Sequence, residues 1–262
     1  MADDLFSVAG QVVLVSGASR GIGRALAAGF AARGAQVIIT GREAATLEQA
    51  ASELSTSETR VRPLVCDVAE PDSIAELMEK VAAEFPRVDT LLNVAGVNKR
   101  KRVETFTVEE FDFILDINLK GAFLLSQHVG RRMLEQQGGS IINIDSLNTY
   151  APLRGVIPYA MSKAGVSMMT RGMAMEWGPQ GVRVNAIAPG FILTDLNRKL
   201  WSEPTMQNWG HTNTPLRRLG EPGDLVGTAL FLAAPASAFM TGQVLYVDGG
   251  ISAGILWPID LP

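Results

Sequence analysis

The sequence has little cysteine, little histidine and no excess of positive charge. Cys66 is the one cysteine in 262 residues, so no disulfide can form within the chain, as expected in a reducing compartment. With only two histidines, a zinc site built from Cys and His alone is disfavoured. The 23 Lys and Arg against 27 Asp and Glu give a net charge of −4. This charge argues against nucleic acid as a partner, because nucleic-acid phosphates attract positively charged surfaces.

Long apolar runs and a basic leader are also missing. Residues 1–4 are acidic where a secretory signal is basic. Among the longer apolar stretches is 225–234, which contains Gly227 and Thr228, is followed by Pro235 and has about half the length of a membrane-spanning helix. We therefore expect no membrane partner and a cytoplasmic location.

Apolar residues, in contrast, are abundant. The chain is 47% hydrophobic and 19% charged, as expected of a globular protein and not of a disordered one. Short β-branched runs alternate with Ala-rich segments of helical period; strands are expected at 12–16, 36–40, 61–66, 88–93, 140–145, 182–188 and 243–247, and helices at 21–33, 43–54, 71–85, 108–136, 159–178 and 221–234. The pattern predicts one α/β domain over residues 1–262, a doubly wound parallel sheet (Rossmann fold) of about seven strands with helices on both faces. The irregular stretch 191–220 opens just past a strand, so it is either a substrate loop or a long surface connection.

A glycine-rich turn follows the first predicted strand and reads Gly17-Ala18-Ser19-Arg20-Gly21-Ile22-Gly23. Glycines let the backbone approach a pyrophosphate closely, and the helix that follows presents free N–H groups and the positive end of its dipole. Strand-to-helix turns also use glycine for steric reasons alone. The position between the first strand and a helix nevertheless favours a nucleotide site.

The second predicted strand ends at Thr40-Gly41-Arg42. A dinucleotide fold that binds NAD has an Asp or Glu at this place, on the ribose hydroxyls. Arg42 and Arg20 could instead hold a 2′-phosphate by charge-assisted hydrogen bonds. This favours NADP(H) and leaves NAD(H) open, because Arg42 could also be a solvated residue at the start of a helix.

Tyr159 and Lys163 stand at i and i+4, so they share one face of a helix. A free tyrosine has a pKa near 10, and a nearby cation lowers that pKa and makes the phenol a usable proton donor or acceptor. The pair alone arises often by chance. Ser146, however, stands at the end of the preceding strand, where its hydroxyl could bind a carbonyl or hydroxyl group in the same pocket.

Ser146, Tyr159, Lys163 and the glycine turn resemble the classical short-chain dehydrogenase/reductase family, and the resemblance covers essentially the whole chain. The other segments that resemble family motifs are Asp67-Val68, Asn93-Val94-Ala95-Gly96 (with Val94 in place of a second Asn), Asn118-Leu119-Lys120-Gly121, Pro189-Gly190 with Ile192 and Thr194, and Val247-Asp248-Gly249-Gly250.

The resemblance implies a role for each member of the reactive set. Tyr159 would be the acid/base, Lys163 would lower its pKa and hold the nicotinamide ribose, Ser146 would orient the substrate oxygen, and Asn118 would hold a relay water. The cofactor, which supplies the hydride, would bind Gly17, Ser19, Arg20, Gly21, Ile22, Gly23, Arg42, Asp67, Val68, Asn93, Ala95, Gly96, Tyr159, Lys163, Pro189, Gly190, Ile192 and Thr194. No metal is implied.

Residues 99–102 place four consecutive cations after the fourth predicted strand. They form either a solvated basic loop or an attraction for an anionic substrate. Within the family, the segment 96–100 resembles the gluconate 5-dehydrogenase and 2-deoxygluconate 3-dehydrogenase branch, which acts on sugar acids. Arg100 is then the first candidate for the substrate carboxylate and Arg154 the second, while Ser146 and Tyr159 bind the reacting oxygen.

Other functions remain open. A 3-oxoacyl-carrier-protein reductase or a polyol dehydrogenase would share the same core motifs. A catalytically silent scaffold protein is disfavoured because Asn118, Ser146, Tyr159 and Lys163 are all present.

The C-terminal residues 251–262 are unusually apolar for a chain end. Burial of Ile255, Leu256 and Trp257 would contribute several kcal/mol at about 25 cal/mol per Å². We expect this tail to pack across a subunit interface, and the family resemblance implies a homotetramer with two-fold symmetry. Trp201 and Trp209 flank the 191–220 segment and either cover the nicotinamide as a lid or anchor the segment to the body.

Overall fold

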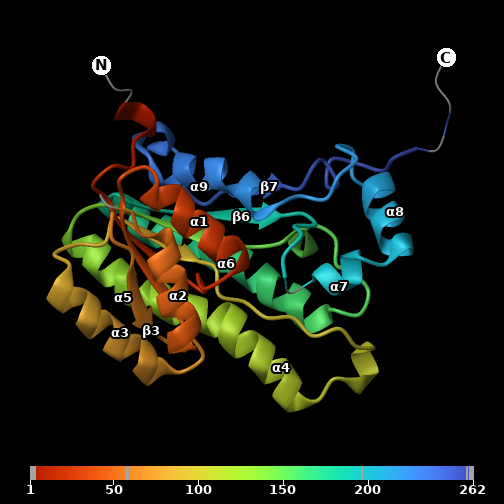
Figure 1. Cartoon of the computed structure of the whole chain (residues 1–262), viewed down its shortest axis with the longest axis horizontal. Helices are drawn as coiled ribbons and strands as arrows, with labels where there is room; N and C mark the ends of the chain where they lie inside the picture. The colour runs from red at the N-terminus through yellow and green to blue at the C-terminus, as the bar shows by residue number, and fades with distance from the viewer. Residues whose placement is uncertain (1–3, 57–58, 196, 258, 260–262) are drawn as a thin grey trace.

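Seven parallel strands form a single sheet in the order β3-β2-β1-β4-β5-β6-β7 (Figure 1). The computed structural model describes residues 4–56, 59–195, 197–257 and 259. The strands are β1 Val12–Ser16, β2 Gln36–Gly41, β3 Arg62–Val65, β4 Thr90–Asn93, β5 Gly139–Ile144, β6 Val182–Pro189 and β7 Val244–Val247. The strand order reverses between β1 and β4, which places the ligand crevice at the carboxyl ends of these two strands. The predicted doubly wound fold is confirmed.

Helices cover both faces of the sheet (Figure 1). One core cluster joins the sheet to α1 (Gly21–Ala31), α2 (Ala44–Leu54) and α9 (Val226–Ala233), and the other joins it to α3 (Pro71–Glu84), α5 (Ala122–Glu135) and α6 (Ile157–Trp177). Val13 and Val15 of β1 point to the first cluster and Leu14 to the second. Because both faces are buried, the strand is apolar at every position except its last, without the alternation of a half-exposed strand.

The segment 108–136, predicted as one helix, is interrupted. It divides into α4 (Val108–Leu115), a π-helical turn η3 (Asp116–Gly121) and α5. A Cβ at Gly121 would lie 2.4 Å from the backbone oxygen of Val68, so the absence of a side chain lets this turn lie against the loop after β3. Single π-helical turns inside α-helices are frequent at functional sites, and this one carries Asn118.

The segment 191–220, predicted as irregular, contains two helices, α7 (Arg198–Trp201) and α8 (Pro204–Asn213). The ring of Phe191 lies between two tryptophans, 5.0 Å from the Trp201 centroid and 5.4 Å from that of Trp209. Trp201 is buried. Of the two interpretations of these tryptophans, the contacts support an anchor for the segment.

Smaller differences concern the ends of elements. The helix α6 begins two residues earlier than expected, with Pro158 in its first turn, where a missing N–H costs little. The predicted helix 221–234 opens as a 3₁₀ turn, η6 (Pro222–Leu225). The remaining 3₁₀ turns are η1 Asp4–Phe6, η2 Val103–Thr105, η4 Leu147–Thr149, η5 Gly178–Gln180 and η7 Pro235–Ser237.

After β7 the chain makes a short turn and then leaves the sheet. The Asp248 carboxylate accepts hydrogen bonds from the N–H groups of Gly250 and Ser252, both at 2.9 Å. Ile255 is 93% exposed and Trp257 72% exposed, so this part of the tail does not pack on its own chain. Residues 258 and 260–262 of the tail lie outside the described residues. Over the described parts of the chain, no helix combines the length and the hydropathy needed to cross a bilayer.

Candidate active site

The glycine turn packs against the loop that follows β4. Gly17 has φ +67°, and a Cβ there would lie 2.6 Å from Cα of Ala95; a Cβ at Gly23 would lie 2.3 Å from the Gly17 carbonyl oxygen. Arg20 precedes α1 without a side-chain hydrogen bond to the helix. The first N–H groups of α1 have no partner within the helix, so the turn offers backbone donors that fit the phosphates of a dinucleotide.

Residues expected around the adenosine part of a cofactor meet at the carboxyl ends of β1, β2 and β3. Nη1 of Arg42 lies 4.0 Å from Oδ2 of Asp67, with the Arg42 side chain half exposed. A Cβ at Gly41 would lie 3.7 Å from Oγ of Ser19. The hydroxyl of Thr40 is buried and has no hydrogen-bond partner among the described residues. The exposed Arg42 cation follows the end of β2, where the sequence predicts the 2′-phosphate of NADP(H).

Asn93 is the last residue of β4, and its side-chain amide forms hydrogen bonds within the protein. Its Nδ2 donates to Oγ of Ser126 at 2.7 Å and to Oδ1 of Asn143 at 2.8 Å. The side chain is therefore part of a buried network between the sheet and α5. The loop itself is held by Ser16, whose Oγ accepts from the N–H groups of Val94 and Ala95.

The segment after β6 lies beside the glycine turn. A Cβ at Gly21 would lie 3.7 Å from Cγ2 of Thr194. Asn197 holds this segment in place, because its Oδ1 accepts from the Thr194 N–H at 2.9 Å and its Nδ2 donates to the Ile192 carbonyl at 2.8 Å. No sequence motif pointed to Asn197 or Ser16, since each acts on the backbone of a motif without belonging to its signature.

Asn118 is buried in the π-helical turn with its side-chain amide fully engaged. Its Oδ1 accepts from the Val97 N–H at 2.8 Å, and its Nδ2 donates to the Val97 carbonyl at 2.9 Å and to Oγ of Ser162 at 3.1 Å. Oγ of Ser162 in turn donates to the carbonyl of Tyr159 at 2.7 Å. Both N–H groups of the amide are used, so Asn118 ties the loop after β4 to α6.

Ser146 lies two residues after the end of β5 and caps η4. Its Oγ accepts from the N–H of Asn148 and from Nδ2 of the same residue, both at 3.1 Å. Oδ1 of Asn148 accepts from the Leu153 N–H at 2.9 Å. The hydroxyl also forms a hydrogen bond with Tyr159 that lowers the pKa of the phenol, so the two predicted reactive side chains meet.

Lys163 is buried beside Tyr159. Its Nζ donates to the Ile144 carbonyl at 2.7 Å and lies 5.7 Å from the centroid of the Tyr159 ring. Burial lowers the pKa of Lys163 to about 8, while Asp145 acts in the opposite direction.

The pKa of the Tyr159 phenol differs from the expectation. It is raised, chiefly by burial and further by Asp145. The lowering expected from Lys163 is therefore not what this structure shows, because desolvation of the phenolate dominates.

Three of the four cations in the basic run 99–102 form ion pairs. Lys99 and Lys101 pair with Glu110 at 3.5 and 2.6 Å, and Arg102 pairs with Glu104 at 2.9 Å. The hydrogen bond from Lys101 is the largest cause that lowers the pKa of Glu110 to about 2. The expected group of four cations thus reduces to one side chain without a carboxylate partner in the described structure, that of Arg100.

Arg100 and Arg154 lie close together. A Cβ at Gly155 would be 3.4 Å from Cγ of Arg100, and the Lys101 N–H donates to the Gly155 carbonyl at 2.9 Å. Arg154 precedes that glycine and is exposed. Among the described residues, neither arginine has an ion pair. The two predicted substrate arginines are therefore carried by adjoining segments.

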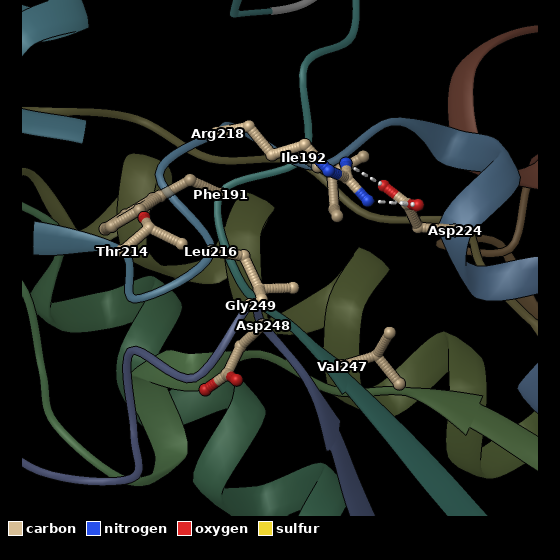
Figure 2. A pocket seen from close by; sticks show the side chains of 10 residues that line it. Phe191, Ile192, Thr214, Leu216, Arg218, Asp224, Val247, Asp248 and Gly249 are labelled. Atoms are coloured by element: carbon tan, nitrogen blue, oxygen red, sulfur yellow. Dashed lines mark hydrogen bonds and ion pairs between the residues drawn. The ribbon is translucent and has the colours of Figure 1, made fainter. Parts of the chain in front are cut away.

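A pocket of about 580 Å³ opens beside the 191–220 segment (Figure 2). Its lining includes Phe191, Ile192 and Leu216, but none of the reactive side chains. Its charged members are satisfied, because Arg218 forms two hydrogen bonds with Asp224 at 2.7 and 2.8 Å. The pocket borders the segment expected to contact the nicotinamide and is separate from Tyr159. Within the described residues, no group of three or more His, Cys, Asp or Glu could hold a metal ion.

Comparisons with known proteins agree with this geometry. A family model described as enoyl-(acyl carrier protein) reductase matches residues 17–252. Gluconate 5-dehydrogenase of Gluconobacter oxydans is 36% identical over 252 residues, covering 96% of this chain and 98% of that protein. A 3-oxoacyl-[acyl-carrier-protein] reductase of Synechocystis is 38% identical over 243 residues, covering 92% and 96%.

A solved structure leads to the same family. The crystal structure of a gluconate 5-dehydrogenase from Burkholderia cenocepacia, in complex with NADP and tartrate, superposes with a TM-score of 0.94 at 34% identity, covering 97% of this chain and 100% of that one. Matches of this length and identity extend well beyond the glycine turn and the reactive residues. The chain belongs to the short-chain dehydrogenase/reductase family of oxidoreductases.

Proposed function

We propose that the protein uses NADP(H) to interconvert a secondary alcohol and a ketone on a sugar acid, of the kind represented by gluconate and 5-ketogluconate. The observation that carries the substrate class is Arg100, which has no carboxylate partner in the described structure while Lys99 and Lys101 are paired with Glu110. An unpaired guanidinium beside the loop after β4 can bind a carboxylate in a bidentate manner. Gluconate 5-dehydrogenases are among the similar proteins.

The cofactor assignment rests on the ends of β1 and β2. The α1 N–H groups would hold the diphosphate and Arg42 the 2′-phosphate, beside Asp67. Segment 189–194 would face the nicotinamide. NADP is named in the complex of the Burkholderia protein. Bound there, the cofactor supplies the hydride in reduction and accepts it in oxidation.

Tyr159 carries the proton. Because burial raises the pKa of its phenol, Tyr159 is protonated at neutral pH, which is the form that gives a proton to a ketone oxygen. Ser146 lies within hydrogen-bond reach of that phenol and would orient the same oxygen. In the oxidative direction the phenolate takes the hydroxyl proton.

A pair of variants in one loop tests the substrate class. We expect Arg100→Met to raise KM for 5-ketogluconate by 10- to 100-fold with kcat within about threefold, because a lost charge-assisted bond contributes about 1.5–3 kcal/mol of binding. Arg102→Met is the matched control, since Arg102 is exposed and paired with Glu104, and it should leave KM unchanged. Equal effects of the two variants, or none from Arg100→Met, would contradict the proposal.

A carrier-protein reductase is the rival function, because a similar reductase is 38% identical. NADPH consumption with a panel of aldonates, keto-aldonates, polyols and acetoacetyl thioesters distinguishes them. We expect turnover of a keto-aldonate and little of the thioester. Preference for the thioester would establish the rival function, and preference for a polyol would remove the role of Arg100.

We also propose that the protein assembles as a homotetramer in which the tail from residue 251 packs on a neighbouring subunit. The support is the exposure of Ile255 and Trp257, which is large for apolar side chains in one segment. Deletion of residues 256–262 should shift the species seen by light scattering towards dimers or monomers. An assembly of unchanged mass would refute the role of the tail.

A further inference from the structure

Asp145 is a buried acid to which the proposed reaction gives no task. It follows the last residue of β5 and precedes Ser146, and its side chain is 1% exposed. Oγ1 of Thr149 donates to its Oδ1 at 2.6 Å, while its Oδ2 is buried without a hydrogen-bond partner among the described residues. A buried carboxylate oxygen without a partner is costly, so a neutral residue would be expected here if packing alone mattered.

The bond between Asp145 and Thr149 closes the turn that carries the Ser146 hydroxyl. Thr149 is the last residue of η4, and its N–H also donates to the Ser146 carbonyl at 3.0 Å. The two bonds connect the end of the turn to its beginning on both sides of Ser146. We call the hydrogen bond from Thr149 to Asp145 the clamp. A neutral acceptor such as Asn would accept this bond equally well, so the clamp does not explain why residue 145 is ionisable.

The nearby Lys163 accounts for an ionisable acid at position 145. Its ammonium donates to the carbonyl of Ile144, the residue directly before Asp145, so the buried ammonium of α6 lies against the backbone next to the buried carboxyl group. Burial of Lys163 favours the neutral amine, and Asp145 is the acid that acts against this loss of the proton. A buried cation near an anion keeps its proton over a wider pH range.

We propose that Asp145 is a positioning residue with two separable effects: its Oδ1 holds the Ser146 turn closed through Thr149, and its negative charge keeps Lys163 in the ammonium form. The inference rests on the proposed function, in which Lys163 and Ser146 act beside Tyr159. It predicts that the clamp affects the height of the activity profile and the charge affects its position on the pH axis.

The other groups around Asp145 are few. Burial raises the pKa of the Asp145 carboxyl group to about 6, so it is ionised at neutral pH, while Thr149, Lys163, the Ser146 backbone and Arg171 of α6 act in the opposite direction. Arg171 is exposed, which weakens its effect. Tyr246 lies on the adjacent strand β7 with its ring 6.1 Å from that of Tyr150, and both Asp145 and Asp248 raise its pKa after burial does. Tyr159 is the remaining neighbour. Lys163 is therefore the one buried cation in this group.

Two variants separate the effects. Asp145→Asn removes the charge and keeps an oxygen that accepts from Thr149; Thr149→Val removes the clamp and keeps the charge. In cofactor-free protein labelled with ¹³C at lysine Cε, the Lys163 resonance, identified by its absence in Lys163→Met, should titrate about one pH unit lower in Asp145→Asn. It should be unmoved in Thr149→Val. An unmoved resonance in Asp145→Asn overturns the electrostatic effect.

Kinetics supply the second readout, in the direction of ketone reduction. For Asp145→Asn, the alkaline fall of kcat/KM should move about one pH unit lower. Thr149→Val should lower kcat about 3- to 10-fold at all pH values, and Thr149→Ser, which keeps the hydroxyl, should recover it. If kcat is as low in Thr149→Ser as in Thr149→Val, the proposed role of the clamp is wrong. If Asp145→Asn does not fold by circular dichroism, Asp145→Ser replaces it.

The readouts distinguish this inference from the proposed function. The resonance of Lys163 requires neither substrate nor cofactor, so a shifted titration with no turnover of any sugar acid refutes the substrate assignment and supports Asp145. Turnover of a sugar acid with an unmoved titration refutes Asp145 and supports the function.

Discussion

The two halves of the candidate site are built in different ways. The half proposed to bind phosphate is a run of seven consecutive residues, Gly17 to Gly23, which offers backbone N–H groups as donors and in which Gly17 and Gly23 lie in close contact with neighbouring backbone. The proposed reactive half is assembled from the turn after β5 and from α6, and its polar groups are side chains: Ser146, Tyr159 and Lys163. Burial raises the pKa of Tyr159 and lowers that of Lys163.

This difference shows which kind of change each half tolerates. Backbone donors persist through most side-chain substitutions, but a methyl group added at Gly17 or Gly23 has no space. The reactive half depends on particular side-chain atoms and on the turn that holds Ser146 in place. Substitutions in one half should therefore change cofactor binding and those in the other half turnover.

The largest expected effect belongs to the reactive half. Tyr159→Phe removes the one oxygen proposed to carry the proton, and we expect kcat to fall by about 10³-fold or more. NADPH affinity, followed by quenching of tryptophan fluorescence, should change less than about threefold. Near-normal turnover would remove Tyr159 from the chemistry, and a large loss of affinity would show that the two halves are not separable.

The phosphate-binding half is tested by Gly23→Ala. The new Cβ would lie 2.3 Å from the Gly17 carbonyl oxygen, so the turn must move, and we expect NADPH affinity to fall about 100-fold with some loss of stability. Gly172→Ala on α6 is the matched control, because a Cβ there meets nothing within 4 Å; it should be neutral or stabilising by up to about 1 kcal/mol. Similar outcomes for the two alanines would mean that the close approach is unimportant.

The pH dependence of stability should come from the reactive half. The pKa of Lys163 is lowered to about 8 in the folded protein, from 10.5 in an unfolded chain. Between these values the unfolded chain binds more protons, so the free energy of unfolding rises with pH.

Denaturant unfolding at pH 7.5 and 9.5 should show that the wild type gains about 2 kcal/mol relative to Lys163→Met over this interval. The Lys163→Met variant serves as the baseline, since every other titrating group is common to both proteins. Parallel curves for the two proteins would show that burial does not displace the proton of Lys163.

The smallest expected effect concerns cofactor choice. Arg42→Met should weaken NADPH binding about tenfold, because one charge-assisted contact with a 2′-phosphate is lost. NADH binding, measured under the same conditions, should stay within about twofold. A loss of affinity for both cofactors alike would assign Arg42 to local structure, beside Asp67.

The positions of the seven strands could be predicted from the sequence. The first of them, 12–16, is an apolar run without alternation, as a strand of a parallel sheet covered on both faces requires. The π-helical turn escaped prediction, since 108–136 has continuous helical periodicity and the cause of the interruption is contact of Gly121 with the backbone of Val68. The helices α7 and α8 escaped for a similar reason, because Phe191 and two tryptophans hold them in place.

Side-chain pairing was the second feature of the site that could not be predicted from the sequence. The run of four consecutive cations did not indicate that two of them form ion pairs with Glu110. That pairing depends on how the start of α4 faces the loop after β4. The side chain of Asn93 is a similar case: its Nδ2 binds Ser126 and Asn143, which are distant in the sequence and were not indicated by the motif.

By itself, the sequence determined the sheet with its alternating helices and the glycine turn after β1, and it predicted the reactive side chains. These features depend on periodicity and on residues close together along the chain. Only the tertiary structure decided that Arg100 has no carboxylate partner among the described residues, that Asn118 ties the loop after β4 to α6, and that burial shifts the pKa values of Tyr159 and Lys163. The physical reason is desolvation together with long-range pairing: both depend on which elements surround a group, and those elements are distant in the sequence.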